Sequence, residues 1–362
     1  MVRVLHVTDS LTTGVGSAVN SLALHQAKRG AKVSVLAVNR PGVRSALSDD
    51  ALAAGVELKL VSAPSRLLGL ISLAWVLLHE GDRFEVLHAH STVAGVVVRV
   101  IGGTRGWSVF YSPHGFASLA DPAEKLSLAK KAAFLVERML RSIGTIIAVG
   151  PSEHQYASKV VGSPRVRTLS NVVELPGGQP SGVGWAAARD QRSARRSKAV
   201  VVSVGRIASQ KRPEWFRSLA TECGPEVEFW WIGGGGPASE FFRHTDVEVF
   251  PSLSKPEYVE RLERADLYIS TARYEGMPLA LMEAQWLGVP GLVVRAPGVL
   301  DALSEGVSGI AVKDLSEMRA TLASVVGDHV WLSRMSVAAT HWARETFSIE
   351  KFHASCLEIY DA

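Results

Sequence analysis

Residues 273–288 read Arg-Tyr-Glu-Gly-Met-Pro-Leu-Ala-Leu-Met-Glu-Ala-Gln-Trp-Leu-Gly. They follow the apolar run Asp266–Ser270, which predicts a buried parallel strand. Pro278 stands where a helix favours its first residue, because proline lacks the N–H that would be unpaired there. Gly288 stands where the residue after a helix adopts a left-handed conformation. The sequence therefore predicts a strand that ends at the start of a helix, and the free N–H groups of such a start attract phosphates.

Two carboxylates bracket this helix start, Glu275 in the loop and Glu283 eight residues later. A carboxylate repels an anion, but it accepts hydrogen bonds from the hydroxyls of a sugar or a ribose. The stretch therefore predicts a ligand that carries both a phosphate and a sugar.

Length and composition limit the possibilities. A chain of 362 residues favours two domains, and its hydrophobic fraction of 47% and charged fraction of 20% are those of a globular protein. The two cysteines, Cys223 and Cys356, predict no disulfide framework or zinc site and fit a reducing cytosol. The N-terminus predicts a strand and no signal peptide, so a cytoplasmic location is expected. The longest apolar run, 67–78, is too short to span a bilayer and predicts a well-buried helix.

The net charge of +4 is unevenly distributed. Residues 1–170 contain 19 Lys and Arg against 11 Asp and Glu, whereas residues 171–362 contain 20 against 24. A basic first half favours an anionic partner or an anionic membrane surface, and an unevenly charged solvated surface is the alternative. Because no basic patch is interleaved with aromatic residues, no nucleic acid is expected as a partner.

The chain alternates short β-branched runs with helical stretches, which predicts an α/β protein of two doubly wound, Rossmann-like domains facing across a cleft. The expected domains are 1–172 and 199–345, joined by a Pro-, Gly- and Arg-rich linker at 173–198. The expected strands are 2–8, 33–38, 56–62, 86–90, 108–112, 144–149 and 166–169, followed by 199–204, 227–232, 246–250, 267–271, 290–294 and 309–312.

Loops at other strand ends add candidate site residues. In the loop 9–17, Gly14 and Gly16 would let the backbone approach a ligand. The third glycine of a dinucleotide fingerprint is missing, and no acidic residue closes the second strand, which disfavours a nicotinamide enzyme.

Three histidines follow apolar strands. His114, next to a glycine in a loop, is the best candidate for a site. His88 is expected to be packed in the core. We expect His88 and His90 to point to opposite faces of their strand, so that they share no metal ion.

Arg206 and Lys211 lie five residues apart in the loop after the strand 199–204. Two fixed cations can bind one diphosphate and stabilise it as a leaving group without a divalent metal. A glycine-rich loop, Gly233–Gly236, follows the next strand.

Together these motifs resemble the retaining glycosyltransferases of family four, which have the GT-B fold, and the resemblance extends over nearly the whole chain. The segments that carry it are Gly205-Arg206 with Lys211, Gly233–Gly235, Glu275–Glu283, the Gly14/Gly16 loop, Val86–Ser91, Tyr111–Gly115, Ala148–Glu153 and Leu169–Glu174.

The resemblance implies a role for each matching residue. Arg206 and Lys211 would hold the donor's diphosphate, Glu275 the hydroxyls of its sugar, and His114 would lie beside the reacting carbon. The donor-binding residues would be Gly16, Gly205, Gly233, Gly234, Gly276, Met277, Pro278, Leu279 and Glu283, the last on the ribose, and the acceptor side would include Gly14, Gly16 and His90. The resemblance also implies front-face attack with retention, no metal and no cofactor, and a last helix, within 346–362, that crosses back to the first domain.

Two segments depart from the family pattern. Val293–Leu300 lacks the usual Gly-Gly pair and glutamate, and Ser270-Thr271 replaces a common Pro-Ser. We expect neither departure to contact the phosphate-binding residues.

The motif Glu275-Gly-Met-Pro resembles that of members that use uridine-diphosphate sugars. Residues 111–116 and 132–140 resemble bacterial enzymes of capsule, exopolysaccharide and O-antigen assembly, whose acceptors are commonly polyprenyl-diphosphate-linked saccharides. An expected helix at 122–142 would lie on the anionic inner face of the cytoplasmic membrane, or else simply present a solvated basic face. Its basic residues are Lys125, Lys130, Lys131, Arg138 and Arg141.

Three alternatives stay open. The first is a GT-B enzyme that glycosylates a small soluble acceptor. The second is a nucleotide-sugar epimerase of the same fold, disfavoured by the Arg206/Lys211 loop and the glutamate pair. The third is a non-catalytic GT-B-like partner subunit, which would not need the complete set of site residues.

Overall fold

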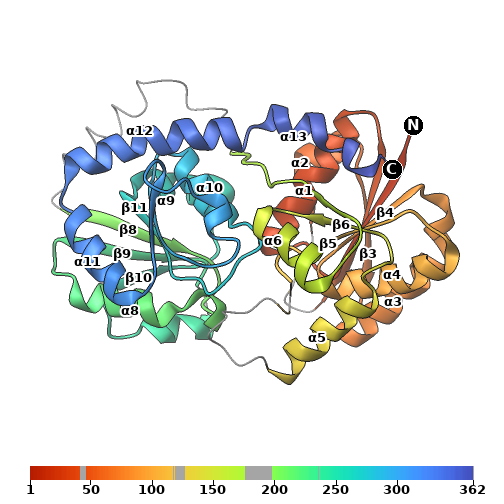
Figure 1. The fold of residues 1–362 in the computed structure, drawn as a ribbon, viewed down its shortest axis with the longest axis horizontal. Coiled ribbons are helices and arrows are strands. Elements are labelled where there is room, and N and C mark those ends of the chain that lie inside the picture. Colours follow the sequence, from red (N-terminus) through yellow and green to blue (C-terminus); the bar gives the residue numbers. More distant parts are fainter. Residues whose placement is uncertain (41–45, 117, 119–126, 176–197, 235, 362) are drawn as a thin grey trace. The chain divides into compact units, whose positions relative to one another are not determined.

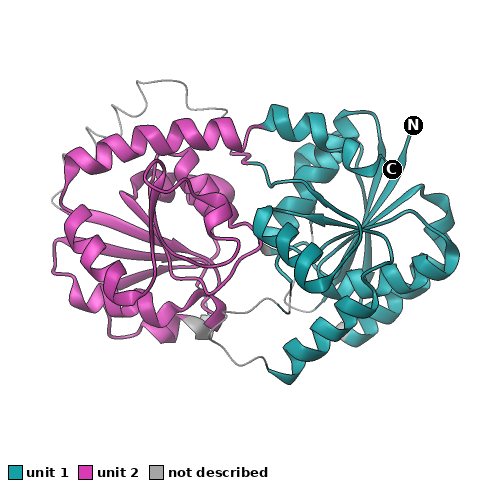
Figure 2. Cartoon of the chain, in the orientation of Figure 1, with its two compact units in different colours: residues 1–172, 349–362 teal, residues 173–348 magenta. Residues whose placement is uncertain are grey.

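The computed structural model describes residues 1–40, 46–116, 118, 127–175, 198–234 and 236–361. They form two compact units, one of residues 1–172 with 349–362 and the other of residues 173–348 (Figure 2).

Unit 1 contains a parallel sheet of seven strands in the order β3-β2-β1-β4-β5-β6-β7 (Figure 1). All seven strands predicted for the first half of the chain are confirmed, each within one residue at either end. They are β1 Arg3–Thr8, β2 Lys32–Asn39, β3 Glu57–Ser62, β4 Val86–His90, β5 Val109–Ser112, β6 Thr145–Ala148 and β7 Val166–Thr168. The inner strands β1 and β2 are almost continuously buried, as expected for a parallel sheet covered on both faces.

The helices of unit 1 occupy the connections between these strands, except for the last two, which belong to the C-terminal segment. They are α1 Thr13–Lys28, α2 Asp49–Ala53, α3 Arg66–Glu80, η1 Gly81–Arg83, α4 Thr92–Arg105, α5 Leu128–Met139, α6 Pro151–Gln155, the π-helical turn η2 Tyr156–Val161, α13 Ile349–Ser355 and η6 Glu358–Tyr360.

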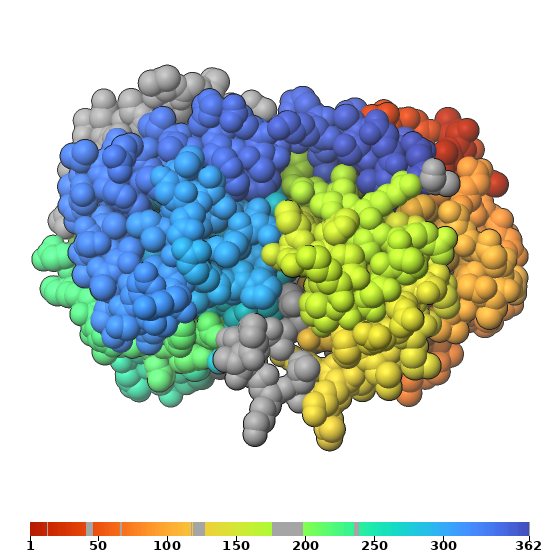
Figure 3. Space-filling model, in the orientation of Figure 1, coloured from red at the N-terminus to blue at the C-terminus, as the bar shows by residue number. Residues whose placement is uncertain are grey.

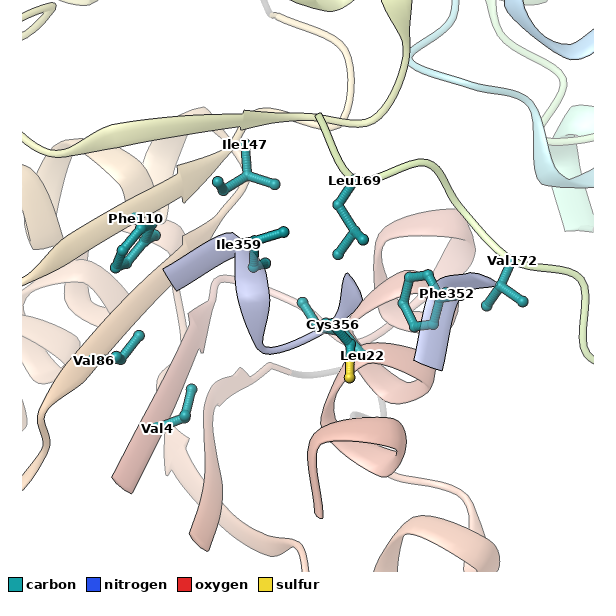
Figure 4. Close-up of a cluster of buried hydrophobic side chains, with 10 residues drawn as sticks. All are labelled: Val4, Leu22, Val86, Phe110, Ile147, Leu169, Val172, Phe352, Cys356 and Ile359. Atoms are coloured by element: carbon teal, nitrogen blue, oxygen red, sulfur yellow. The ribbon is translucent and has the colours of Figure 1, made fainter. Parts of the chain in front are cut away.

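The C-terminal segment is part of the core of unit 1. Phe352 of α13, Cys356 and Ile359 of η6 are buried in one apolar cluster (Figure 4). The cluster also contains Val4, Leu22, Val86, Phe110, Ile147, Leu169 and Val172. Burial of the Phe352 and Ile359 side chains, at about 1.5–3 kcal/mol each, holds this segment on the sheet.

Helix α3 contradicts the expectation of a well-buried helix. Leu73 and Leu77 are fully buried, but Leu67, Ile71 and Trp75 are 68%, 57% and 60% exposed. These three positions recur at helical spacing on one face of α3. The helix is thus apolar on both its buried and its exposed face.

Helix α5 is shorter than the expected helix 122–142, because it begins at Leu128 and ends at Met139. Lys125 lies outside the described residues. A fully buried ion pair, 2.7 Å between Arg99 of α4 and Glu137 of α5, joins the two helices. The hydroxyl of Tyr111 donates to the other oxygen of Glu137 at 2.7 Å, so this carboxylate is satisfied inside the unit.

Unit 2 contains a parallel sheet of six strands in the order β10-β9-β8-β11-β12-β13. The six predicted strands are confirmed as β8 Ala199–Val204, β9 Val227–Ile232, β10 Val247–Phe250, β11 Leu267–Ser270, β12 Gly291–Val294 and β13 Gly309–Val312. The helices are η3 Ser209–Lys211, α8 Pro213–Glu222, η4 Gly236–Phe242, α9 Lys255–Arg264, α10 Leu279–Trp286, η5 Leu300–Ala302, α11 Leu315–Val325 and α12 His329–Thr346. The chain order reverses between β8 and β11, which is where doubly wound sheets bind ligands.

The helix predicted from residues 273–288 is α10, with one correction at each end. It begins at Leu279, and Pro278 is the residue before it, with φ −74° and ψ 101°. It ends at Trp286, so its eight residues make about two turns. Gly288 has φ 73°, so the left-handed residue that follows the helix is confirmed.

Within the part of the chain that the structure describes, no helix combines the length and the apolar character needed to cross a bilayer.

Candidate functional site

The candidate site of unit 2 is built from loops at the carboxyl ends of three neighbouring strands, β9, β8 and β11. Gln210 ties two of these loops together, because its carbonyl accepts from the N–H of Arg273 at 2.8 Å and its side chain donates to the carbonyl of Tyr274 at 3.0 Å. The loop after β8 and the loop after β11 therefore form one surface.

Lys211 and Glu275 meet on this surface. The Nζ of Lys211 lies 2.6 Å from Oε1 of Glu275, and the two side chains are 22% and 13% exposed. The hydroxyl of Thr271 donates to the carbonyls of Lys211 and Arg212. The expectation that the Ser270-Thr271 departure leaves the phosphate residues untouched was wrong, because this hydroxyl fixes the backbone that carries Lys211.

Glycines let these loops approach one another. A Cβ on Gly205, at φ 140°, would lie 2.8 Å from Cε of Lys211. A Cβ on Gly233, at φ 98°, would lie 3.0 Å from the carbonyl oxygen of Gly205. Gly234 packs against the side chains of Ile207 and Val249. Gly205 thus makes room for the lysine, while Gly233 and Gly234 pack loop against loop.

Gly298 supports Glu275 from the loop after β12. A Cβ on Gly298, at φ 74°, would lie 2.1 Å from the carbonyl oxygen of Glu275 and 2.5 Å from that of Gly276. The N–H of Glu275 donates to the carbonyl of Pro297 at 3.0 Å. The departing segment Val293–Leu300 therefore supports the site directly, which sequence reasoning missed.

Glu283 already has two partners in unit 2. The hydroxyl of Tyr258 donates to its Oε2 at 2.7 Å, and Lys255 forms an ion pair with its Oε1. Burial and the neighbouring carboxylate raise the pKa of Tyr258 well above its ordinary value. The only sequence signal for these partners is the run Ser254-Lys-Pro-Glu-Tyr258, a helix start with a capping box that gives no hint of its distant carboxylate.

The other donor-site candidates lie close by in the chain but differ in exposure. Arg206 is exposed, and among the described residues it has no recorded hydrogen bond or ion pair. Gly276, Met277 and Pro278 are buried, and Leu279 begins α10. Arg206 therefore presents a solvated guanidinium beside the Lys211 loop.

Unit 1 holds a cluster of histidines on the sheet face that α1 and the C-terminal segment cover. His6, His88 and His90 are at most 1% exposed, and the rings of His88 and His90 lie 4.2 Å apart. The expectation that His88 and His90 face opposite sides was wrong, because residues two apart in a strand point to the same face.

Every ring nitrogen of these three histidines has a hydrogen-bond partner. His6 contacts His90 at 2.9 Å and Gln26 at 2.8 Å. His88 contacts Tyr360 and Ser112 at 2.9 and 2.8 Å. Their nitrogens lie within 4.8 Å of one another, a spacing compatible with a metal site, but here they bond to each other and to neutral groups.

His90 and His114 are directly linked, since Nδ1 of His90 lies 2.9 Å from Nε2 of His114. Both ring nitrogens of His90 are therefore occupied, and this buried residue cannot contact an acceptor directly as expected. It supports His114 instead. Sequence reasoning missed His6, because a histidine in the middle of a first strand carries no motif.

Burial dominates the electrostatics of this cluster. It lowers the pKa of His6 to about 4 and that of His114 to about 4. Burial first, and then the neighbouring histidines, lower the pKa of His88 and of His90 well below the ordinary value. All four imidazoles are therefore neutral at pH 7.

The loop of His114 has an unusual backbone. His114 has φ 54° and Gly115 has φ 93°. The buried carboxylate of Glu153 holds the loop, because its two oxygens accept from the N–H groups of Gly115 at 2.6 Å and Val149 at 2.8 Å. A non-glycine residue in the left-handed region is typical of functional sites.

The expectation for Gly14 and Gly16 needs correction. Both lie in the first turn of α1, which begins at Thr13, so the loop after β1 is shorter than predicted. A Cβ on Gly16 would lie 2.1 Å from the carbonyl oxygen of Leu11. Gly16 thus allows the chain to approach itself, and Gly14 is exposed at the helix start.

Comparison with known proteins identifies relatives of this chain. E. coli UDP-Gal:alpha-D-GlcNAc-diphosphoundecaprenol alpha-1,3-galactosyltransferase is 24% identical to this chain, in an alignment that covers 63% of this chain and 62% of that protein. This chain thus spans less than two thirds of that relative. D-inositol 3-phosphate glycosyltransferase of Streptosporangium roseum is 23% identical over 91% of this chain and 85% of its own length.

A solved structure shows the same fold. HepE of Anabaena, in complex with UDP and glucose, superposes with a TM-score of 0.78 at 14% identity, over 99% of both chains.

Two family models match the chain. The Glycosyl transferase 4-like domain matches residues 13–171, and Glycosyl transferases group 1 matches residues 186–326. The first match ends at residue 171, one residue before the first segment of unit 1 ends, and the second match lies within unit 2. With both domains and the fold accounted for, this chain belongs to the family-four glycosyltransferases of the GT-B fold.

Proposed function

We propose that this protein transfers a sugar from a nucleotide-diphosphate sugar to a hydroxyl of an acceptor. The observation that carries the proposal is the ion pair of Lys211 and Glu275 at the switch point of the unit 2 sheet, 2.6 Å between Nζ and Oε1. A cation for a diphosphate and a carboxylate for sugar hydroxyls are thereby held together by the loops after β8 and β11.

Each residue of the unit 2 site has its own role in binding the donor. Lys211 and the exposed Arg206 bind the donor's diphosphate, and the diphosphate competes with Glu275 for the Lys211 ammonium. Glu275 then accepts hydrogen bonds from hydroxyls of the donor sugar, while the backbone of 276–279 faces the phosphate. Glu283 holds the ribose hydroxyls alongside Lys255 and Tyr258.

Transfer proceeds with retention and without a metal ion. The bond between the anomeric carbon and the diphosphate oxygen breaks, the acceptor oxygen bonds to that carbon on the same face, and the acceptor's proton passes to the leaving phosphate. Lys211 and Arg206 stabilise the charge that develops on the leaving group. In this route neither carboxylate acts as a nucleophile or general base, because Glu275 binds hydroxyls of the donor sugar and Glu283 is held by Tyr258 and Lys255.

The donor is a uridine-diphosphate sugar. Two observations favour it: the Escherichia coli relative is named for a UDP-linked donor, and the Anabaena structure holds UDP.

The acceptor is a polyprenyl-diphosphate-linked saccharide at the inner face of the cytoplasmic membrane. The Escherichia coli relative is named for such a lipid-linked acceptor. Unit 1 also exposes apolar side chains that a lipid surface would cover: Leu128 and Met139 of α5 are 84% and 72% exposed, on the same helix as the exposed Lys131 and Arg138. Figure 3 shows α5, in yellow, at the molecular surface.

A small soluble acceptor is the second candidate. The relative from Streptosporangium roseum, which matches 91% of this chain, is named for a D-inositol 3-phosphate acceptor. A non-catalytic partner subunit fits less well, because Lys211, Glu275, Glu283 and His114 are all present and held in defined contacts.

Ligand-dependent melting tests the donor. The protein is heated with UDP-glucose, UDP-galactose, UDP-N-acetylglucosamine or GDP-mannose, each with a metal chelator. A donor present at 100 times its Kd adds about 2.7 kcal/mol to the free energy of unfolding and raises the Tm. A rise with a UDP-sugar in the presence of chelator supports the proposal. No rise with any nucleotide sugar, with or without added Mg²⁺ or Mn²⁺, would overturn it.

A further inference from the structure

A continuous run of hydrogen bonds connects the C-terminal segment with the ring of His114. The side-chain nitrogen of Gln26 donates to the backbone carbonyl of Cys356 at 2.9 Å, and its oxygen lies 2.8 Å from Nε2 of His6. Nδ1 of His6 lies 2.9 Å from Nε2 of His90, whose Nδ1 lies 2.9 Å from Nε2 of His114. All five residues belong to unit 1.

The backbone carbonyl gives this run one direction. A carbonyl only accepts, so the amide nitrogen of Gln26 must face Cys356 and its oxygen must face His6. In this orientation the second N–H of the amide donates to the hydroxyl of Tyr360 at 2.9 Å. His6 must therefore carry its proton on Nε2, where it donates to Gln26.

Each following ring is then determined by the one before it. A neutral imidazole has one donor and one acceptor nitrogen. Because Nδ1 of His6 is an acceptor, His90 carries its proton on Nε2. Because Nδ1 of His90 is then an acceptor, His114 also carries its proton on Nε2. The neutrality of these rings follows from their burial among groups without formal charge, namely each other, Gln26, Tyr360 and Ser112.

His114 is positioned to use this proton arrangement. Its ring stacks on that of His90, with centroids 5.2 Å apart and planes at 22°, and Glu153 holds the loop backbone. Among the described residues, none is recorded as a hydrogen-bond partner of its Nδ1. Nδ1 of His114 thus offers a lone pair for which the described part of the chain supplies no donor.

We propose that the Cys356 carbonyl, acting through Gln26, His6 and His90, holds His114 as its Nε2–H tautomer and makes Nδ1 an acceptor for a substrate hydroxyl. Gln26, His6 and His90 are positioning residues. A neutral sugar offers the required O–H donor, whereas the carboxylate of a uronic acid brings only lone pairs and is disfavoured at this position. The choice of sugar rests on the proposed function, but the tautomer does not.

Nuclear magnetic resonance of the full chain tests the tautomer directly. Protein labelled with ¹⁵N-histidine gives long-range ¹H–¹⁵N correlations that distinguish Nε2–H from Nδ1–H rings, and the His114 signals are those that His114→Gln removes. At pH 7.5 His114 is expected as Nε2–H. A wild-type spectrum with His114 mainly as Nδ1–H or as the imidazolium would overturn the proposal without any further variant.

Two variants test whether the tautomer of His114 depends on the hydrogen bonds that run through Gln26 or on the neighbouring bond between Ser112 and His88. Gln26→Leu removes the acceptor of His6, so the Nδ1–H form of His114 should appear. Ser112→Ala breaks only the bond of Ser112 to His88, a branch that does not lead to His114, and should leave the tautomer unchanged. An unchanged tautomer in folded Gln26→Leu, or an equal change in Ser112→Ala, would contradict the assigned route. If Gln26→Leu does not fold, the wild-type spectrum still decides.

Transfer kinetics test the substrate. Gln26→Leu should lower kcat/KM about threefold to tenfold for a neutral nucleotide sugar, the effect of one uncharged hydrogen bond, and Ser112→Ala should not. The loss should disappear with the monodeoxy donor that lacks the contacted hydroxyl. An undiminished loss with every monodeoxy donor would overturn the hydroxyl contact. A wild-type protein with the expected tautomer but no transfer would refute the proposed function and leave the tautomer assignment standing.

Discussion

The side chain of Lys211 is paired with that of Glu275, 2.6 Å between Nζ and Oε1, although the two residues come from loops after different strands. The pair forms because β8 and β11 are neighbours in the sheet. Each residue thereby neutralises the other, and under the proposed function a ligand with a negative diphosphate and donating hydroxyls would separate them.

Removal of either partner should abolish most of the transfer activity. Lys211→Ala and Glu275→Ala are each expected to lower kcat about 10²–10³-fold, the usual effect of losing one preorganised charge-stabilising group. Lys211→Ala should also weaken UDP binding, whereas Glu275→Ala should weaken the binding of a UDP-sugar more than that of UDP.

Lys313→Ala is the matched control, since Lys313 is an exposed lysine of the same unit whose side chain has no partner among the described residues. Its rate should equal that of the wild type. Unchanged transfer in both site variants, with circular dichroism showing a native fold, would refute the site assignment.

Gly298 should prove necessary for the position of Glu275. Both Gly298 and Gly306 have positive φ, 74° and 77°, but only at Gly298 would a Cβ meet the backbone of the Glu275 loop. Gly298→Ala and Gly306→Ala should each cost about 1–2 kcal/mol of stability for the left-handed backbone. Only Gly298→Ala should add a clash and lower the affinity for a UDP-sugar.

Chemical denaturation and calorimetric titration measure the two effects. Equal donor affinity in the two alanine variants would show that the Gly298 contact does not position the site.

The sequence predicted the sheets well because strand signals are local. Each of the 13 expected strands is a short β-branched or apolar run, and in parallel sheets such runs are buried on both faces. The glycines and the Arg206/Lys211 loop were found for the same reason, since a loop motif lies within a few consecutive residues.

The errors come from contacts that join distant parts of the chain. The pairing of Glu283 with Tyr258 and the support of Glu275 by Gly298 depend on sheet order, which a linear motif does not contain. The exposed apolar face of α3 was missed because the run 67–78 is apolar all round the helix. Such a pattern predicts that every face of the helix is buried. The prediction for His88 and His90 was wrong for a different reason. Successive side chains of a strand alternate between its two faces, so residues two apart lie on the same face.

Acid should destabilise the protein through His6. Its pKa is lowered to about 4 by burial, against 6.5 in the unfolded chain. Between these values the unfolded state binds a proton that the folded state does not, so the free energy of unfolding falls as the pH falls from 6.5 to 4. Above pH 6.5 this histidine has no effect on the slope. The loss amounts to about 3 kcal/mol.

Urea denaturation at half-unit steps of pH measures this loss, and His6→Asn provides the comparison, because carboxylates titrate in both proteins. The difference between the two proteins should depend on pH only below 6.5. A pH-independent difference would show that His6 is readily protonated in the folded state.

The apolar faces of α3 and α5 should bind anionic lipid. Ile71 and Trp75 of α3 are 57% and 60% exposed, and Lys131 and Arg138 add positive charge on α5. Flotation with vesicles should show binding to phosphatidylglycerol mixtures, little binding to phosphatidylcholine alone, and weaker binding at high salt. Lys131→Glu with Arg138→Glu should reduce the affinity by at least tenfold, at about 1 kcal/mol for each basic residue.

Ile71→Ser with Trp75→Ser should reduce binding to the same vesicles, whereas Val330→Ser, at a position 81% exposed on α12 of unit 2, should not. The effect of these variants on transfer kinetics distinguishes a lipid-linked acceptor from a small soluble one. If the acceptor is lipid-linked, the α3 and α5 variants should raise the apparent KM for acceptor in vesicles and leave hydrolysis of the UDP-sugar unchanged. If the wild-type protein does not bind vesicles and transfers sugar to a free inositol phosphate at full rate, the acceptor is a small soluble molecule. The exposed apolar faces of α3 and α5 then contact something other than lipid.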